Sequence, residues 1–405
     1  MGVEAYGIYI YVITWCTILI IPSKLGLDSA TLRFVSAYNA LKRWSSLRGF
    51  LIRSNQLTLI TSLVVSCLLS IILWIVRDRL DADLTRAFWI GCFVIPVTAL
   101  ITLNLATLRS LFHASLAQFP IAVINPLLIG LIIAMLFFGF GKKVDGSAAM
   151  HVYLLSSFLV LFLTILLLKK KIPKSVFETI SEYRGSEWMV VSLPLMFTSA
   201  MGVILNSADT VLVGSILGTS KAGIYSVAAR LAMLILFLLN AINVISGPMI
   251  SALYAKKDFK ELQRLINLIA LVMIIYTIPL TLILIFAGKW ILAIYGHEFT
   301  TAKNALIILS VAQLINALAG PVGYLLTMTG HQKQAAWVLG ISVLLNILLN
   351  IVLIPYFGIN GAAIGTAITT ITWNLVLAYL VWKYLKINMF ALISSFPKFS
   401  GIIKG

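Results

Sequence analysis

The sequence contains little charge. Only 11% of its 405 residues are Asp, Glu, Lys or Arg, whereas 61% are hydrophobic. Globular domains carry roughly 25% charged residues, so this chain cannot cover a water-soluble surface. Acidic residues are scarcest, with 13 against 30 basic residues. Because the basic residues are scattered between apolar runs, they indicate membrane topology rather than a nucleic-acid-binding patch. We therefore expect a multi-pass membrane protein. Its expected partner is the lipid bilayer, and binding to nucleic acid is not expected.

Cysteine and the usual motifs for cofactors are also scarce. Cys16, Cys67 and Cys92 each lie within an apolar run, so we expect buried thiols rather than disulfides or metal ligands. The histidines are isolated and lack a second ligand at helical spacing, which argues against a metal site. The chain contains no GxxxxGK[ST] loop, so direct coupling to ATP is not expected. We therefore predict no cofactor.

Charge-free apolar runs recur along the whole chain. A spanning helix needs about 20 mostly apolar residues, and these runs lack the alternation of a barrel strand. The last run is broken at "IPYFGINGAA" (354–363), which we interpret as a turn between two helices. We predict an all-α protein with eleven spans within the runs 5–23, 54–76, 87–108, 110–141, 146–168, 188–208, 231–255, 265–288, 304–332 and 334–382.

The basic residues are distributed unequally between the two sides of the membrane. Loops that follow odd-numbered spans contain 21 Lys and Arg residues, and loops that follow even-numbered spans contain 8. Lys and Arg are enriched in cytoplasmic loops. We therefore predict a cytoplasmic C-terminus and a location in the cytoplasmic membrane.

The chain also contains an internal repeat. "MGVEAYGIY" (1–9) resembles "LGTSKAGIY" (217–225), and "SAYNALKRWSSL" (36–47) resembles "SALYAKKDFKEL" (251–262), at a spacing of about 215 residues. Such a period predicts two parallel six-helix lobes, which we place at 1–187 and 188–405. A helix (188–217) precedes the second phrase but not the first, so we expect a twelve-helix protein whose first helix is missing from this chain.

Several phrases of the second half resemble a known family. They are "SLPLMFTSAMGVILNSADTVLVGSILGTSKAGIYSVAARL" (192–231), "GPMISALYAKKD" (247–258), "ILAIYGHEFTTAKNALIILS" (291–310) and "NILLNIVLIPYFGINGAAIGTAI" (346–368). They are similar to the polysaccharide-transporter branch of the multidrug/oligosaccharidyl-lipid/polysaccharide exporter superfamily, which includes the O-antigen flippases. The resemblance is strong over 188–385 and weaker over 1–168. None of these phrases encodes the substrate.

The resemblance implies a membrane transporter with two six-helix lobes. Members of this branch flip undecaprenyl-diphosphate-linked oligosaccharides by alternating access, for surface polysaccharide biosynthesis. Cationic side chains in the cavity would hold the anionic diphosphate. The implied partners are this lipid-linked glycan and the polysaccharide polymerase and glycosyltransferases of the same pathway. Coupling to an H⁺ or Na⁺ gradient is left open.

Two charged residues lie within predicted spans, where a charge is costly and usually functional. Arg230, in "YSVAARLAMLILFLL", is our first candidate for substrate binding. An arginine keeps its charge and offers forked donors to a diphosphate. Related flippases have an Arg at the matching place, although Arg230 could instead snorkel to the interface. Asp209, in "NSADTVLVG", is interpreted as a cavity residue or a proton or cation site, or as a buried partner of Arg230.

Four further basic residues lie near helix ends. Arg33, in "LDSATLRFVSAY", follows the first span and is placed to meet an entering head group, or to anchor the topology near anionic lipid. Lys24, Arg53 and Arg109 are weaker candidates for the same cavity.

Two other functions remain open. A small-molecule or multidrug antiporter with this fold would need buried carboxylates for a cationic cargo, and Asp209 alone is available. A membrane glycosyltransferase or polymerase would need catalytic groups in large external loops. The acidic cluster Asp78, Asp81 and Asp83 alternates with arginines in a short loop, so we interpret it as a solvated face.

Overall fold

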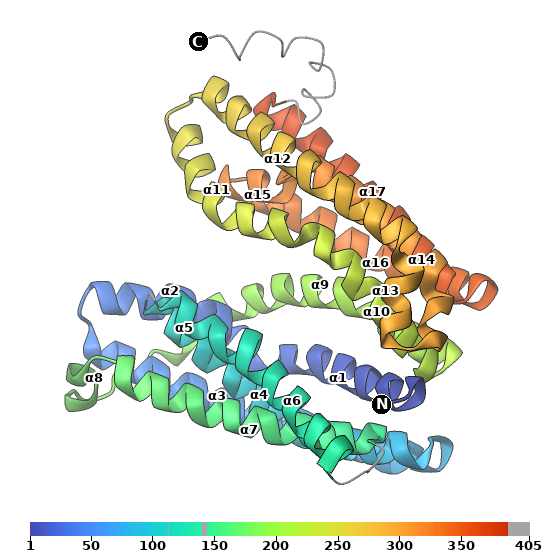
Figure 1. Ribbon diagram of the computed structural model, residues 1–405. Helices are drawn as coiled ribbons and strands as arrows, with labels where there is room; N and C mark the ends of the chain where they lie inside the picture. The colour runs from blue at the N-terminus through green and yellow to red at the C-terminus, as the bar shows by residue number, and fades with distance from the viewer. Residues whose placement is uncertain (112, 140–143, 388–405) are drawn as a thin grey trace. The chain divides into compact units, whose positions relative to one another are not determined.

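The computed structural model describes residues 1–111, 113–139 and 144–387 (Figure 1). All regular secondary structure assigned in these ranges is helical, and eleven helices there are long and apolar enough to cross a membrane. The expected all-α class and the eleven spans are therefore confirmed. The turn predicted at 354–363 is also present, because α16 ends at Phe357 and α17 begins at Ile359. Lys142, Lys143, Lys398 and Lys404, which contributed to the counts of basic residues in loops, lie outside the described ranges.

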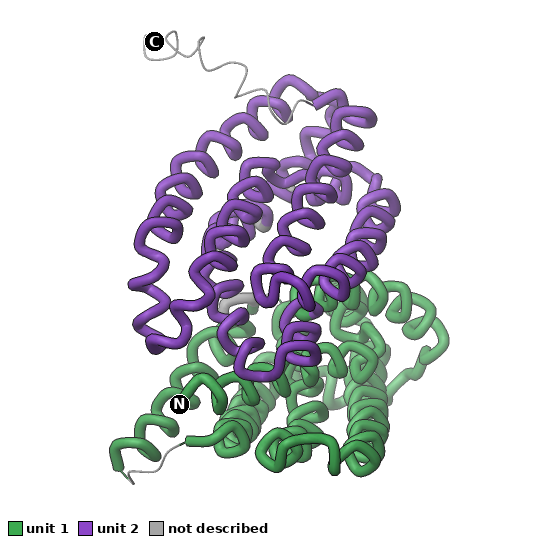
Figure 2. Tube along the Cα trace, turned by 90° about the vertical axis from the view of Figure 1, so that its right-hand side faces the viewer, with its two compact units in different colours: residues 1–207 green, residues 208–405 purple. Residues whose placement is uncertain are grey.

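The chain forms two compact units, residues 1–207 and 208–405 (Figure 2). The division falls within α9 (Gly185–Leu217), whereas the predicted lobe boundary between residues 187 and 188 lies near the beginning of that helix. Unit 1 contains, before α9, the elements α1 (Val3–Lys24), α2 (Leu27–Ala40), α3 (Trp44–Val76), η1 (Arg77–Arg79), α4 (Ala82–Ser110), α5 (Ala114–Phe119), η2 (Pro120–Ile124), α6 (Asn125–Ala134), η3 (Met135–Gly139), α7 (Gly146–Lys171) and α8 (Lys174–Glu178).

Unit 2 begins within α9 and continues through the remaining helices. They are α10 (Thr219–Met233), η4 (Leu234–Leu236), α11 (Phe237–Ala255), α12 (Phe259–Phe286), α13 (Gly288–Tyr295), η5 (His297–Ala302), α14 (Lys303–Ala319), α15 (Val322–Met328), α16 (Gln332–Phe357) and α17 (Ile359–Leu385).

Helix α4 is the centre of unit 1. It packs against α1, α2, α3 and α7, and 67% of its most apolar stretch is buried. The neighbouring span Leu116–Gly139 is more apolar, but none of its most apolar stretch is buried. Exposed apolar side chains on a spanning helix are suited to lipid, which is as apolar as the protein core. Hydrophobicity alone therefore did not indicate which helix forms the core.

The cysteines and the acidic loop differ in part from expectation. Cys16 and Cys92 are buried as predicted, but Cys67 is exposed on α3, so the prediction of three buried thiols was wrong at this position. Asp83 is not merely solvated. Its carboxylate accepts hydrogen bonds from the backbone N–H groups of Gly146 (3.0 Å) and Ser147 (3.2 Å), and so caps the first turn of α7.

The internal repeat is visible as repeated local structure. The hydroxyl of Ser36 donates to the carbonyl of Ser110 (3.0 Å), and the hydroxyl of Ser251 donates to the carbonyl of Met328 (3.2 Å). The two helix ends after these serines also match. Lys42 and Lys257 have φ angles of 53° and 57°, and each is followed by a residue whose N–H reaches back five positions. Each half therefore uses the same left-handed turn to join two helices.

Candidate functional site

Asp209 is a buried carboxylate in unit 2. Its side chain is on α9, and the residue is 6% exposed. Its Oδ2 accepts a hydrogen bond from the Tyr225 hydroxyl on α10 (2.8 Å) and another from the Thr366 hydroxyl on α17. Its Oδ1 accepts a hydrogen bond from the Asn350 amide on α16 (2.7 Å). Four helices therefore converge on one acid.

The sequence of α16 supplies two asparagines to this cluster. Asn346 and Asn350 are one turn apart, so they lie on the same face of the helix. The Asn350 amide also donates to Asn346 Oδ1 (3.1 Å), and the Asn346 amide lies 3.5 Å from the Thr366 hydroxyl. A Cβ at Gly361 would lie 2.2 Å from the carbonyl oxygen of Leu353, so glycine is required where α17 begins against the end of α16. This close turn sets the position of Thr366.

The pairing of Asp209 with Arg230, one of the alternatives given for Asp209, does not form. The ion pairs among the described residues do not include Asp209. Arg230 is exposed in the last turn of α10. It follows Tyr225 by five residues, which corresponds to a rotation of roughly 140° around a helix with 3.6 residues per turn. Tyr225 faces Asp209, so Arg230 points toward a different side.

The cluster offers oxygen atoms to a small hard cation. Asn350 Oδ1 is buried and has no hydrogen-bond partner among the described residues, although buried polar atoms usually have one. The nitrogen of the same amide donates to Asp209 Oδ1 and to Asn346 Oδ1, so the carboxylate of Asp209 and two amide oxygens belong to one buried cluster. Carboxylate, amide and hydroxyl oxygens suit hard cations rather than thiophilic metals. The described residues contain no group of three His, Cys, Asp or Glu that could hold a metal. The arrangement therefore fits a proton or a hard cation.

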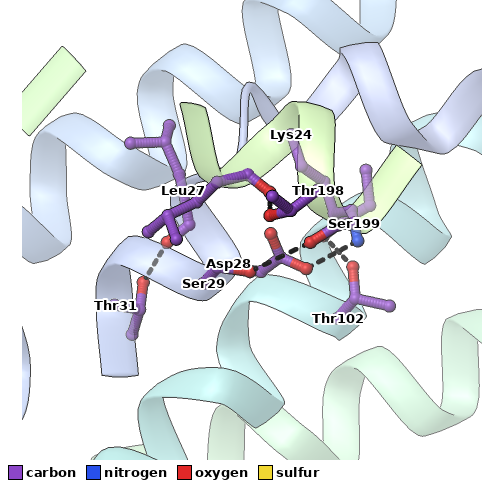
Figure 3. A network of polar contacts seen from close by, with 10 residues as sticks. Lys24, Leu27, Asp28, Ser29, Thr31, Thr102, Thr198 and Ser199 are labelled. Carbon is purple, nitrogen blue, oxygen red and sulfur yellow. Dashed lines mark hydrogen bonds and ion pairs between the residues drawn. The ribbon is translucent and has the colours of Figure 1, made fainter. Parts of the chain in front are cut away.

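In unit 1, Lys24 is neutralised by Asp28, which was not among the predicted site residues. Lys24 Nζ lies 2.7 Å from Asp28 Oδ2, and their side chains are only 16% and 19% exposed (Figure 3). The Ser29 and Ser199 hydroxyls lie 3.4 Å apart in the same region, where the end of α1, the beginning of α2 and α9 meet. The spacing Lys-x-x-x-Asp was visible in the sequence. Because Lys24 is paired, it is a weaker candidate for an anionic ligand than the sequence suggested.

Arg33 has an unpaired charge beside a pocket. The residue is exposed on α2, and no ion pair in the described part of the chain includes it. The pocket has a volume of about 640 Å³ and is formed by α2 and α9, with Arg33 and Ser29 beside mainly apolar residues such as Leu32, Val190 and Leu195. It can therefore accept a ligand that has both an anionic and an apolar part.

The remaining candidates are exposed near helix ends or on helix surfaces. Arg109 lies in the last turn of α4, and Arg53 lies in the third turn of α3. Neither residue lines the pocket that contains Arg33. Among these candidates, Arg33 lines a pocket, whereas Arg53, Arg109 and Arg230 are exposed at separate places on the surface. Sequence reasoning missed Tyr225, Asn346, Asn350 and Thr366, although the pair of asparagines in an apolar helix was a usable signal.

Solved structures share this fold. A multidrug resistance MATE family transporter in an inward-facing conformation has a TM-score of 0.75, with 14% identity, 97% of this chain covered and 94% of that chain covered. The lipid II flippase MurJ, in an inward closed conformation, has a TM-score of 0.69, with 18% identity and coverage of 98% and 86%. Identities this low establish similarity of fold only.

Curated relatives include flippases from the archaeon Haloferax volcanii. The probable low-salt glycan biosynthesis flippase Agl15 is 29% identical over 190 residues, which cover 47% of this chain and 39% of that protein. The probable flippase AglR is 32% identical over 164 residues, which cover 40% of this chain and 34% of that protein. The matched regions thus span less than half the length of these relatives. Both relatives are named as probable flippases, and neither name denotes an enzyme.

Family models cover both halves of the chain. The MatE model matches residues 194–352. The model described as polysaccharide biosynthesis protein matches residues 1–254, which is more than half of the chain. Together with the eleven candidate spans of the described residues, this match shows that the chain belongs to the family of polysaccharide biosynthesis membrane proteins.

Proposed function

We propose that this protein flips a polyprenyl-diphosphate-linked oligosaccharide across the cytoplasmic membrane by alternating access. The observation that carries the proposal is the pocket of unit 1, where the unpaired guanidinium of Arg33 lies beside apolar residues of α2 and α9. Arginine binds phosphate oxygens through its forked donors and stays charged at any physiological pH. The apolar wall suits the hydrocarbon part of such a lipid. The flippase relatives support the same substrate class.

We further propose that the Asp209 cluster couples transport to an H⁺ or Na⁺ gradient. A carboxylate that is buried without a cationic partner gains strongly from a proton or a cation. A cation that binds one conformation more tightly than the other shifts the population between them. The cluster joins four helices of unit 2, so a change of charge there acts on their packing.

We also propose that the C-terminus lies in the cytoplasm, because basic residues are more frequent in the loops on that side.

The two rival functions have less support. An exporter of cationic drugs would need a carboxylate open to its cargo, whereas Asp209 is buried and accepts three hydrogen bonds. A glycosyltransferase or polymerase would need free acids outside the membrane, but Asp83 is used to cap α7. The polymerase and glycosyltransferases of a polysaccharide pathway are proposed as partners that consume and supply the cargo.

The proposal is tested with the purified full chain in vesicles. The probe is an undecaprenyl-diphosphate-linked sugar that carries a fluorescent group, and a membrane-impermeant reductant reports its exposure on the outer leaflet. We expect protein-dependent flipping, which Arg33→Gln reduces at least tenfold. Arg86→Gln is the matched control, because Arg86 is exposed and donates only to a carbonyl of its own helix. Flipping no faster than in protein-free vesicles would refute the proposed function.

A further inference from the structure

A second pocket lies at one end of unit 1, apart from the pocket of Arg33. It has a volume of about 310 Å³ and is formed by the turn between α2 and α3 together with the segment 179–184 that precedes α9. Three cations line it, Lys42, Arg43 and Arg184, with Glu182 as the single acid. Neither the family match nor the proposed transport function accounts for this pocket.

The walls of the pocket are held together by specific hydrogen bonds. Arg48 Nη1 donates to the carbonyl oxygens of Phe177 (2.8 Å) and Thr179 (2.5 Å), which fixes the connecting segment to α3. The N–H of Glu182 donates to the carbonyl of Ser45 (3.1 Å). A Cβ at Gly49 would lie 1.8 Å from the Glu182 carbonyl oxygen, so the two backbones are in direct contact. The pocket is therefore built by the fold and is not an accidental meeting of loose loops.

The charges in the pocket do not balance. The Glu182 carboxylate accepts hydrogen bonds from the Ser46 hydroxyl (2.5 Å) and from Arg184 Nε (2.9 Å). These bonds lower the pKa of Glu182, and the bond from Ser46 has the largest effect. Glu182 is therefore ionised, and Arg184 carries the opposite charge beside it. Lys42 and Arg43 are exposed and take part in none of the ion pairs of the described residues. Arg184 also lies 3.7 Å from Glu187, so two acids face the three cations and a net positive charge is left for an anion.

The pocket lies where two candidate spanning helices begin. The spanning helix α3 begins at Trp44, which lines the pocket, and the spanning helix α9 begins at Gly185, next to Arg184. Tryptophan is enriched at the level of lipid head groups, and basic pockets at the ends of spanning helices bind anionic head groups. We propose that this pocket binds the phosphate head group of an anionic phospholipid of the surrounding bilayer.

Such a lipid would contact the turn between α2 and α3 on one side and the segment that joins the two repeats on the other. It would be a bound component of the membrane and not the transported cargo. The proposal does not depend on the proposed transport function, because the pocket is separate from Arg33 and Asp209 and its test measures binding alone.

The test measures lipid retention by the full chain with native mass spectrometry. The probes are phosphatidylglycerol, phosphatidylcholine and inorganic phosphate. We expect phosphatidylglycerol to bind more tightly than phosphatidylcholine, and Lys42→Gln/Arg43→Gln to weaken its binding roughly 30-fold, since each cation near an anionic lipid contributes about a fivefold factor. Lys169→Gln/Lys170→Gln is the matched control, because it removes the same charge from exposed lysines at the end of α7. This control should bind nearly as well as the wild type.

Two results would overturn the proposal. Equal loss in both double variants would show that diffuse surface charge, and not the pocket, attracts the lipid. Displacement of phosphatidylglycerol by equimolar inorganic phosphate would show a site for a soluble anion instead. If the Lys42→Gln/Arg43→Gln variant does not fold, Glu182→Gln decides. That change removes the single acid of the pocket, so binding should tighten about fivefold, and unchanged or weaker binding would refute the assignment.

Discussion

Replacing Asp209 with asparagine tests the coupling site directly. The side chain keeps its size, but its negative charge is removed from a cluster in which three donors point at the carboxylate. Hydrogen bonds to a charged group contribute about 1.5–3 kcal/mol and neutral ones about 0.5–1.5 kcal/mol, so the bonds together weaken by roughly 3 kcal/mol. The variant also avoids the cost of burying a charge, which is several kcal/mol. The two effects oppose each other, and we expect stability to change by no more than about 2 kcal/mol.

Cation binding, in contrast, should disappear. A ligand at ten times its Kd stabilises the folded protein by about 1.4 kcal/mol. For a unit of this size, that corresponds to a rise in Tm of roughly 3–6 °C. The assay is a thermal scan of the full chain in detergent, in NaCl and in KCl at equal ionic strength, and then across pH. A sodium-dependent shift in the wild type indicates Na⁺ coupling, and a shift with pH alone indicates H⁺ coupling.

The control for this experiment is Asp258→Asn. Asp258 is exposed at the beginning of α12, where its carboxylate accepts the N–H of Glu261 (3.0 Å), so the same chemical change is made away from the cluster. Asp258→Asn should keep the cation-dependent or pH-dependent shift, and Asp209→Asn should lose it. A full shift in Asp209→Asn, or a wild type that responds to neither Na⁺ nor pH, would refute the assignment of Asp209 as the coupling site.

Three further predictions concern packing and charge. Gly361→Ala should lower the Tm by several degrees in a thermal scan, because its Cβ meets a backbone carbonyl at 2.2 Å, whereas Gly202→Ala, with open space around it, should leave Tm unchanged or raise it. In detergent at alkaline pH, where the reactive thiolate can form, a membrane-permeant maleimide should label Cys67 faster than the two buried cysteines, and equal rates by mass spectrometry would contradict the burial. The Glu182 carboxylate has a lowered pKa, so its contribution to holding the segment 179–184 is fully present at neutral pH and is lost as the pH falls through its folded-state pKa. In the wild type, we therefore expect hydrogen exchange of that segment, corrected for intrinsic rates, to become faster at low pH. This dependence on pH should be absent from the Ser46→Ala/Glu182→Gln variant.

Much of the fold was determined by the sequence alone. The length of each apolar run is imposed by the thickness of the bilayer, so eleven spans were predicted before any contact was known. The break at Gly358 followed from Pro and Gly in one short stretch. The repeat was visible because turns and helix ends constrain sequence more than lipid-facing helix surfaces do. Lys42 and Lys257, which share a left-handed conformation, lie in the two matching phrases.

The tertiary structure decided which side chains meet. Asp209 finds its partners 16, 141 and 157 residues away along the chain, and nothing in the local pattern selects them over Arg230. Cys16 and Cys67 both lie in apolar runs, but Cys16 is buried and Cys67 is exposed. In a membrane protein, side chains that face the core and side chains that face lipid are both apolar. The hydrophobic pattern that identifies a span therefore does not show which of its faces packs against other helices. That face, and the polar cluster within it, are set only by the packing of helices that are distant in sequence.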